Sequence, residues 1–421
     1  MVDNVWLSNQ YKENRKLFVL FLLAFIINPF VGMLLGLSGY FRLHNPQKTQ
    51  AYLLMISISA FLGVLNMGKE PFMDTNFYIE YFRRVDNFHL IDSILNYRTD
   101  SFFLREPFFN ILSVLLHVVL LGNIPLYFFC VTIIIYLLHF VSIYKLFEHF
   151  GINMKIIFIP IALMVLFFPM FNQSAHLLRQ ELASGLLVYA IVQRIITGKN
   201  NWLFLFLTLM THYSTLLFIL LSLIPQIYRK LSARLIVGAF FTILILYYMF
   251  SYLANLFFSS GMILFFTIGH SMTGLLESNS DSENGTWGIF NLLYFSPLLI
   301  LSLYNILKIK KTGESILSFS YIYIVLFMLM LVFMSAGVAT LQFRYSLYTG
   351  SFIPFVIIPI LSVLGRNGLS RMKLMVVAYT FIFFYLLYNS KVYSSIGDIL
   401  TKPFFMYIND SPLLSPTDVE I

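Results

Sequence analysis

Charged residues are scarce in this chain of 421 residues, at 11% of positions against 59% for apolar ones. A soluble domain carries roughly a quarter of charged residues. The charges are also clustered, so that no Asp, Glu, Lys or Arg lies between Glu106 and Lys145 or between Arg234 and Glu277. Such long uncharged runs exclude an ordinary soluble protein and indicate segments that lie in lipid.

The apolar runs are continuous and lack the alternating polarity of barrel strands. Lipid requires every backbone polar group to be paired within the protein, and a run of ~20 apolar residues spans a bilayer as a helix. We therefore predict an all-α polytopic integral membrane protein with about 11–13 hydrophobic helical segments, some short or re-entrant. One helical domain is expected over residues 1–400, followed by a C-terminal tail, 401–421, that is unstructured or interfacial. The candidate spans are 17–41, 51–68, 107–122, 125–147, 156–172, 180–197, 201–227, 235–257, 288–307, 317–338, 345–364 and 372–390.

Cysteine is nearly absent, and the single Cys130 excludes an internal disulfide and a cysteine metal site. No His and Glu residues have zinc-ligand spacing, and Gly-rich phosphate loops and a serine-nucleophile elbow are also missing. We expect no metal and no cofactor. The formal charge of +8 sits in short loops between spans, which is typical of membrane topology and does not indicate nucleic-acid binding.

Basic connections belong in the cytoplasm, and 194–199, 229–234, 308–311 and 366–373 are basic. The connection Glu277 to Glu283 has three acids and no base, which places an acidic loop, 258–287, on the outward side. Counting along the chain places 173–181 and 341–344 there too. The segment 69–106, a loop with short helices, is also outward if 107–122 is a short or re-entrant helix. The N-terminal run contains Asn28-Pro29, and crossing once or doubling back are both open.

The run 201–227 has basic loops at both ends, which a single crossing cannot satisfy. Its centre, Thr211-His212-Tyr213-Ser214, is polar. A helical hairpin or broken helix with His212 at its apex resolves the charge conflict. Irregular backbone at that depth is tolerated where it lines a cavity, so we predict that His212 faces an outward polar cavity.

The outward segment 69–106 holds seven acids and five bases. Asp74, Tyr78 and Tyr81 follow helical spacing and share one face, which would suit sugar rings; an interfacial aromatic belt with solvated charges is the alternative. Glu106 precedes Pro107 at a predicted helix start, where capping is the competing role.

Two further polar clusters carry arginine. Asn172, His176 and Arg179 have the spacing of one helix face, and an ionisable group at the end of a span is a functional candidate, with snorkelling to headgroups as the alternative. Leu341 to Tyr345 contains Arg344. Two outward guanidinium groups suit a diphosphate, and His212 can exchange a proton near neutral pH.

At these residues the chain resembles the EpsG family of bacterial polysaccharide polymerases, which is allied to the Wzy O-antigen polymerases. The resemblance covers about residues 50–350. One departure is Met73 and Thr75 beside Asp74, where the family usually shows a small residue before the aspartate and an aromatic residue soon after it. The pieces that carry the resemblance occur in the order Asp74-Thr-Asn-Phe-Tyr78-Ile-Glu-Tyr81, Glu106-Pro107, Arg179-Gln180-Glu-Leu-Ala183, Thr211-His212-Tyr-Ser214 and Arg344-Tyr345.

The resemblance implies a glycan transfer from undecaprenyl diphosphate to the sugar hydroxyl of an incoming lipid-linked repeat unit, at the outer face of the inner membrane. Arg179 and Arg344 would bind the diphosphate, and Asp74, Glu106 or His212 would accept the hydroxyl proton. Membrane lipid, a chain-length regulator and a flippase are the expected partners, with no nucleic acid. The expected substrate-binding residues are Tyr78, Tyr81, His176, Gln180, Ser214, Gln342 and Tyr345.

Three other functions stay open. An O-antigen ligase uses the same donor with a different acceptor. A lipid-linked oligosaccharide flippase would need a charged central cavity, and these spans supply few such residues. A structural partner in an export complex would tolerate substitution of both arginines.

Overall fold

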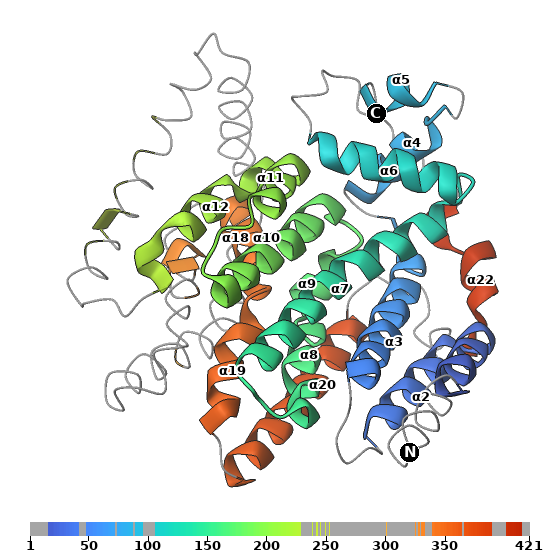
Figure 1. Ribbon diagram of the computed structural model, residues 1–421. Helices are drawn as coiled ribbons and strands as arrows, with labels where there is room; N and C mark the ends of the chain where they lie inside the picture. Colours follow the sequence, from blue (N-terminus) through green and yellow to red (C-terminus); the bar gives the residue numbers. More distant parts are fainter. Residues whose placement is uncertain are drawn as a thin grey trace, which may run out of the picture.

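A computed structural model describes residues 16–41, 48–71, 74–86, 89–95, 106–228, 339–363, 366–389 and 401–414, together with single residues between 238 and 332. The predicted spans 235–257, 288–307 and most of 317–338 lie outside the described residues, as does the predicted acidic loop 258–287. The described part is helical and contains no strand, which confirms the all-α prediction (Figure 1).

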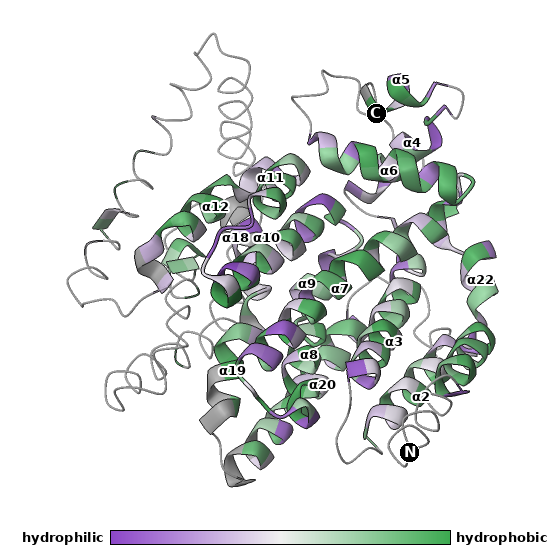
Figure 2. Ribbon diagram, viewed as in Figure 1, coloured by the Kyte–Doolittle hydropathy of each residue, from purple (hydrophilic) through white to green (hydrophobic). Residues whose placement is uncertain are grey.

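Three of the described helices are long and apolar enough to cross a membrane. They are α3 (Lys48–Met67), α7 (Ile124–His149) and the Met372–Asn389 part of α20 (Arg366–Asn389). Large apolar side chains are exposed on α20, among them Phe381 at 73% and Tyr388 at 78%. Water would penalise such a surface and lipid favours it, so the composition and the exposed surface agree on a membrane protein (Figure 2).

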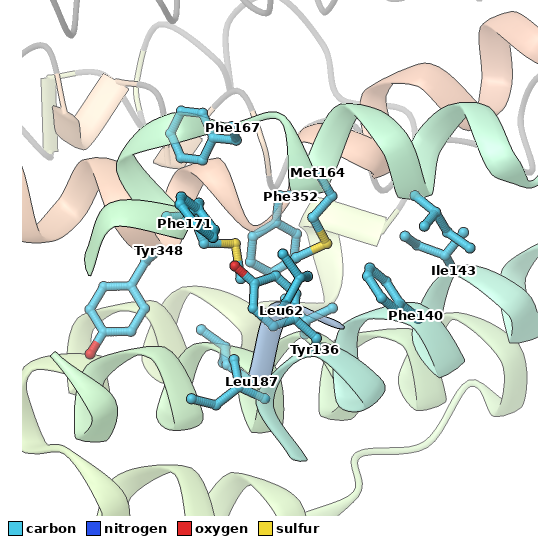
Figure 3. Packing of buried hydrophobic residues seen from close by; sticks show 14 of the residues in the cluster. Leu62, Tyr136, Phe140, Ile143, Met164, Phe167, Phe171, Leu187, Tyr348 and Phe352 are labelled. Atoms are coloured by element: carbon cyan, nitrogen blue, oxygen red, sulfur yellow. The ribbon is translucent and has the colours of Figure 1, made fainter. Parts of the chain in front are cut away.

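The core lies where α7 packs against α3 and against α10 (Leu178–Thr197), and where α8 (Phe158–Val165) packs against α19 (Ile353–Val363). Aromatic and branched side chains from these helices form one continuous buried cluster. Figure 3 shows part of it, with Tyr136 and Phe140 of α7, Leu187 of α10 and Phe352 in the same cluster. This cluster fixes how α10 sits, and α10 carries the site described below.

The N-terminal run doubles back at Asn28-Pro29. A helix over Lys16–Ile27 is followed by α2 (Pro29–Phe41). The two helices pack antiparallel because Gly32 lies against Phe25, and Gly39 lies against Leu17. A Cβ on Gly32 would come within 2.6 Å of the Phe25 backbone, so glycine permits this close approach. Each helix is short of the ~30 Å hydrocarbon core at 1.5 Å per residue, which gives a hairpin and not a single crossing.

The run 201–227 is a hairpin with His212 at its apex, as predicted. α11 (Trp202–Thr211) ends at His212, whose backbone is extended, and α12 (Leu216–Leu223) follows a short turn over Tyr213–Thr215. Arg194, near the end of α10, donates to the carbonyl of Ser222 in α12. α11 starts beside that same end of α10, so both arms of the hairpin return to one level of the bundle.

The C-terminal residues 401–414 are folded, which excludes the unstructured alternative for this part of the predicted tail. α22 (Phe404–Asn409) lies beside the upper end of α3 (Figure 1). The Ser411 hydroxyl donates to the carbonyl of Met67 at the end of α3, and Leu413 is fully buried. These contacts supply the burial and the hydrogen bonds that hold 401–414 against the helical bundle.

Candidate functional site

Glu106 is the hub of a buried polar cluster. It precedes α6 (Pro107–Val119) with φ 59°, in the left-handed region that non-glycine residues rarely adopt. Glu106 occupies the N-cap position of α6, but its side chain forms no capping hydrogen bond, so capping alone does not account for the carboxylate. One carboxylate oxygen instead accepts from Arg179 Nη1 and the other from His212 Nδ1. Strained backbone of this kind is found at functional sites, where the surrounding structure maintains it.

Arg179, in the first turn of α10, distributes its donors over three partners. Besides Glu106, its Nη2 donates to Asp74 Oδ2 at 3.2 Å, and its Nε donates to the Tyr78 hydroxyl at 3.2 Å. The guanidinium also lies 5.6 Å from the centre of the Tyr78 ring. A guanidinium has five N–H donors, so these bonds leave donors to spare for a ligand.

Three helices direct their N-terminal ends at this cluster. Asp74 is the first residue of α4 (Asp74–Arg83), Glu106 precedes α6, and Arg179 is the second residue of α10. Helix N-termini carry unpaired N–H groups and a partial positive charge. Their convergence stabilises the two carboxylates and adds positive potential beyond that of the arginine.

His212 is held in one tautomer by Glu106. A carboxylate can only accept hydrogen bonds, so Nδ1 of His212 carries the proton that it donates. Nε2 is then the ring nitrogen with a free lone pair. The residue is 9% exposed. A carboxylate that orients a histidine and raises its basicity is a recurrent arrangement in proton transfer.

α18 (Ala339–Gly350) brings the second arginine to the cluster. Gln180 Nε2 donates to the backbone carbonyl of Arg344 at 2.9 Å, and Ser214 lies 2.9 Å from the Tyr348 hydroxyl. Within the described part of the chain, the half-buried Arg344 guanidinium forms no ion pair or hydrogen bond. Arg179 is thus held by carboxylates, whereas Arg344 lacks a protein counter-ion there.

Two of the predicted polar segments have a different local structure. Asn172, His176 and Arg179 do not share a helix face, because α9 (Phe168–Gln173) ends before α10 begins at Leu178. Residues 341–348 form part of α18 and not a loop between two spans. Phe171 and Lys69 explain the break after α9: the Lys69 ammonium donates to the Phe171 carbonyl and lies 4.1 Å from its ring.

The remaining predicted residues divide into those near the cluster and those packed elsewhere. His176 is buried and lies 2.7 Å from the Thr75 hydroxyl, which ties the start of α4 to the α9–α10 connection. Tyr345 packs edge-on against Phe218 with ring centres 5.3 Å apart. Tyr81 lies farther along α4. The side chain of Gln342 lies outside the described residues.

The sequence pattern did not indicate the structural roles of Lys69 and Asn66. The amide of Asn66 donates to Thr132 and Ser174, at 2.8 and 3.0 Å, and so ties α3 to α7 and to the α9–α10 connection. Burial lowers the pKa of Lys69 well below its usual value, and the charge of Glu181 opposes that effect. A lysine that directly follows a span on the predicted outward side runs against the positive-inside rule. That exception was a signal of an internal role.

Fold and site together define a helical membrane protein with a buried Asp–Arg–Glu–His cluster at one end of its bundle. The chain belongs to the EpsG family, which it matches over residues 50–408. This is a family of polysaccharide polymerases of glycosyltransferase-like type, so the prediction of family and of general function is confirmed. No curated protein and no solved structure matches the chain.

Proposed function

We propose that this protein polymerises a bacterial surface polysaccharide, O-antigen or exopolysaccharide. It would transfer the growing glycan from undecaprenyl diphosphate to a sugar hydroxyl of an incoming lipid-linked repeat unit. The proposed location is the inner membrane with the cluster on the periplasmic side, in company with a flippase and a chain-length regulator. The donor already carries an activated leaving group, so no nucleotide sugar and no metal would be required.

One observation carries the proposal: distant parts of the chain meet around Glu106 and Arg179 at one end of the bundle. Arg179 and His212 each contact the Glu106 carboxylate, and Asp74 contacts Arg179. Gln180 ties the backbone of Arg344 to the same end of α10. Arg194, fifteen residues after Arg179, lies ~22 Å away along the helix at 1.5 Å per residue. The cluster therefore lies at the end of the bundle opposite the basic connection at 194–199.

The cations of the cluster support a role in holding the diphosphate. Arg179 and Arg344 are formally balanced by Asp74 and Glu106, so the helix N-termini and the two guanidinium groups must attract the ligand locally. Arg344 is the group best placed to bind phosphate oxygens, because it has no counter-ion in the described part of the chain. Arg179 adds its spare donors. Both would stabilise charge on the leaving diphosphate as the bond breaks.

The Glu106–His212 pair supports a role in proton transfer. The acceptor hydroxyl oxygen would form a bond to the anomeric carbon of the growing chain while the bond from that carbon to the phosphate oxygen breaks. The lipid diphosphate leaves with the bonding electrons, and Nε2 of His212 takes the hydroxyl proton. Glu106 stabilises the imidazolium that results. Asp74 would keep Arg179 in place beside the diphosphate.

Replacement of each cluster residue, scored by the glycan ladder on a gel, tests the proposal. Arg179→Ala and Arg344→Ala should each abolish long chains and leave single repeat units. Membrane levels and detergent-extracted size of each variant serve as the folding control. Long chains in both variants, with normal protein levels, would show that the arginines do not hold the diphosphate. A deletion strain that caps the lipid core with no repeat at all would point to a ligase.

A further inference from the structure

A pocket of about 240 Å³ opens between the C-terminal half of α4 and α5 (Leu90–Leu95). It lies on the same helix as Asp74 but away from the Glu106 cluster. Its volume is below the roughly 300–1,000 Å³ typical of sites for drug-sized ligands, which fits one ring of a larger molecule. The side chains that matter for recognition are Tyr81, Arg84, Asp86, His89, Asp92 and Ser93.

Tyr81 is the aromatic residue of the pocket lining, and the Phe77 ring stacks on it from outside that lining. Phe77 and Tyr81 are one helical turn apart on α4, and their rings are nearly parallel at 20° with centres 6.3 Å apart. Phe77 is 51% exposed. Tyr78, on another face of α4, is 2% exposed and packs against Phe109 and Arg179. Its ring is covered, so the accessible aromatic surface of α4 is Phe77 with Tyr81, not Tyr78 with Tyr81.

The polar wall offers donors and acceptors with little net charge. Asp86 lies 2.8 Å from His89 Nδ1, and Arg84 pairs with Glu80 one turn earlier. The hydrogen bond from His89 to Asp86, together with the Asp86 charge, raises the pKa of this exposed histidine. The Ser93 hydroxyl accepts from the Asp86 backbone N–H at 2.9 Å, which fixes the turn between the two helices.

The chemistry of the pocket differs from that of the Glu106 cluster. Its cations are each paired with an acid, and Asp92 adds a further carboxylate, so it disfavours a diphosphate. An aromatic face beside carboxylate and imidazole groups suits a sugar ring, which presents C–H groups on its face and hydroxyls at its edge. Tyr81 is seven residues after Asp74, about 10 Å along α4 at 1.5 Å per residue.

We propose that this pocket is a glycan-binding subsite that holds a sugar ring of the lipid-linked substrate, away from the reacting diphosphate end. The assignment rests on the proposed polymerase function. It makes α4 a bridge between the two activities, with Asp74 at the Glu106 cluster and Tyr81 at the sugar. A repeat unit bound at both places would lie along this helix. The protein would then recognise the sugar in the pocket as well as the diphosphate at the Glu106 cluster.

The test is a titration of lipid-free repeat-unit oligosaccharide onto the purified full-length protein, with binding measured by saturation-transfer NMR. A detergent without a sugar headgroup is needed, since a glycoside headgroup would compete. Tyr81→Ala and Asp92→Ala should each weaken binding by about tenfold or more, because each removes a stacking face or a charged hydrogen-bond partner. Phe405→Ala is the control, since it removes a 51% exposed aromatic ring in α22 that does not line the pocket.

Two further measurements separate the subsite from the reaction. Arg344→Ala should abolish polymerisation and leave oligosaccharide binding unchanged. If wild-type protein does not bind the free oligosaccharide, or if both pocket variants bind it as the wild type does, the subsite assignment is wrong. If the wild type binds it but forms no polymer from lipid-linked units, the polymerase proposal fails and the pocket stands.

Discussion

Replacement of Glu106 by glutamine is the most informative single perturbation of the cluster. The change keeps the size of the side chain and its place before Pro107 but removes the negative charge. The carboxylate accepts from both Arg179 and His212. A glutamine amide has one acceptor oxygen and one donor nitrogen. With its oxygen accepting from Arg179, its N–H group faces Nδ1 of His212, which can accept that bond only in the other tautomer, with the proton on Nε2, where the ring can no longer take a proton from the hydroxyl.

The expected magnitude follows from these two contacts. Positioned acid–base groups contribute about 10²–10⁴-fold to a rate, so the polymerisation rate of Glu106→Gln should fall within that range. Hydrogen bonds to charged groups are worth about 1.5–3 kcal/mol each, and Glu106 and Arg179 are both well buried, at 7% and 13% side-chain exposure. A lower melting temperature in detergent should accompany the loss of rate. Asp74→Asn should lower the polymerisation rate and the melting temperature by less, because the Asp74 carboxylate is 32% exposed.

The assay is chain growth from purified lipid-linked repeat units, measured as initial rate at equal amounts of folded protein. Glu148→Gln serves as the control, since it removes an exposed carboxylate from the far end of α7. A Glu106→Gln protein that elongates within about threefold of the wild-type rate, far less than acid–base catalysis contributes, would refute the catalytic role of the Glu106–His212 pair.

Three other predictions concern single features. Arg344→Lys should keep the charge, lose paired donation to phosphate and raise the concentration of lipid-linked unit needed for half-maximal rate; an unchanged value would argue against diphosphate contact. Gly350→Ala should destabilise by about 1–3 kcal/mol, since the added Cβ would overlap the Phe167 ring, whereas at Gly68 the nearest atom is 3.6 Å away and alanine should be tolerated; equal melting temperatures would contradict this packing. Alkaline phosphatase fused after residue 414 should be active, because 401–414 packs at the same end of the bundle as the Glu106 cluster; an inactive fusion would reverse the proposed orientation.

The hydrophobic pattern and the charge pattern together predicted most of what the structure shows. Uncharged runs predicted helices, and the conflict between basic loops at both ends of 201–227 predicted the hairpin at His212. Those inferences worked because the cost of unpaired backbone in lipid and the sidedness of basic loops act on local sequence. Family membership was predicted from the order of five short motifs and is confirmed.

Details that depend on tertiary contacts could not be predicted in the same way. Spacing placed Asn172 and Arg179 on one helix, but the buried Lys69 binds the backbone at the end of α9 and a second helix begins after it. Glu106 resembled a cap because its position before proline suits one, and its partners lie 73 and 106 residues away. Helical spacing also favoured Tyr78 as a sugar contact, and only the packing of Phe109 shows that its ring is covered.

The most direct test of the account is polymerisation by the purified protein in liposomes, supplied only with repeat units linked to undecaprenyl diphosphate. The account predicts a glycan ladder that forms without any nucleotide sugar, with one lipid diphosphate released for each bond, and that disappears in His212→Ala and Arg344→Ala. A ladder that requires a nucleotide sugar, or one that persists undiminished in both variants, would contradict it.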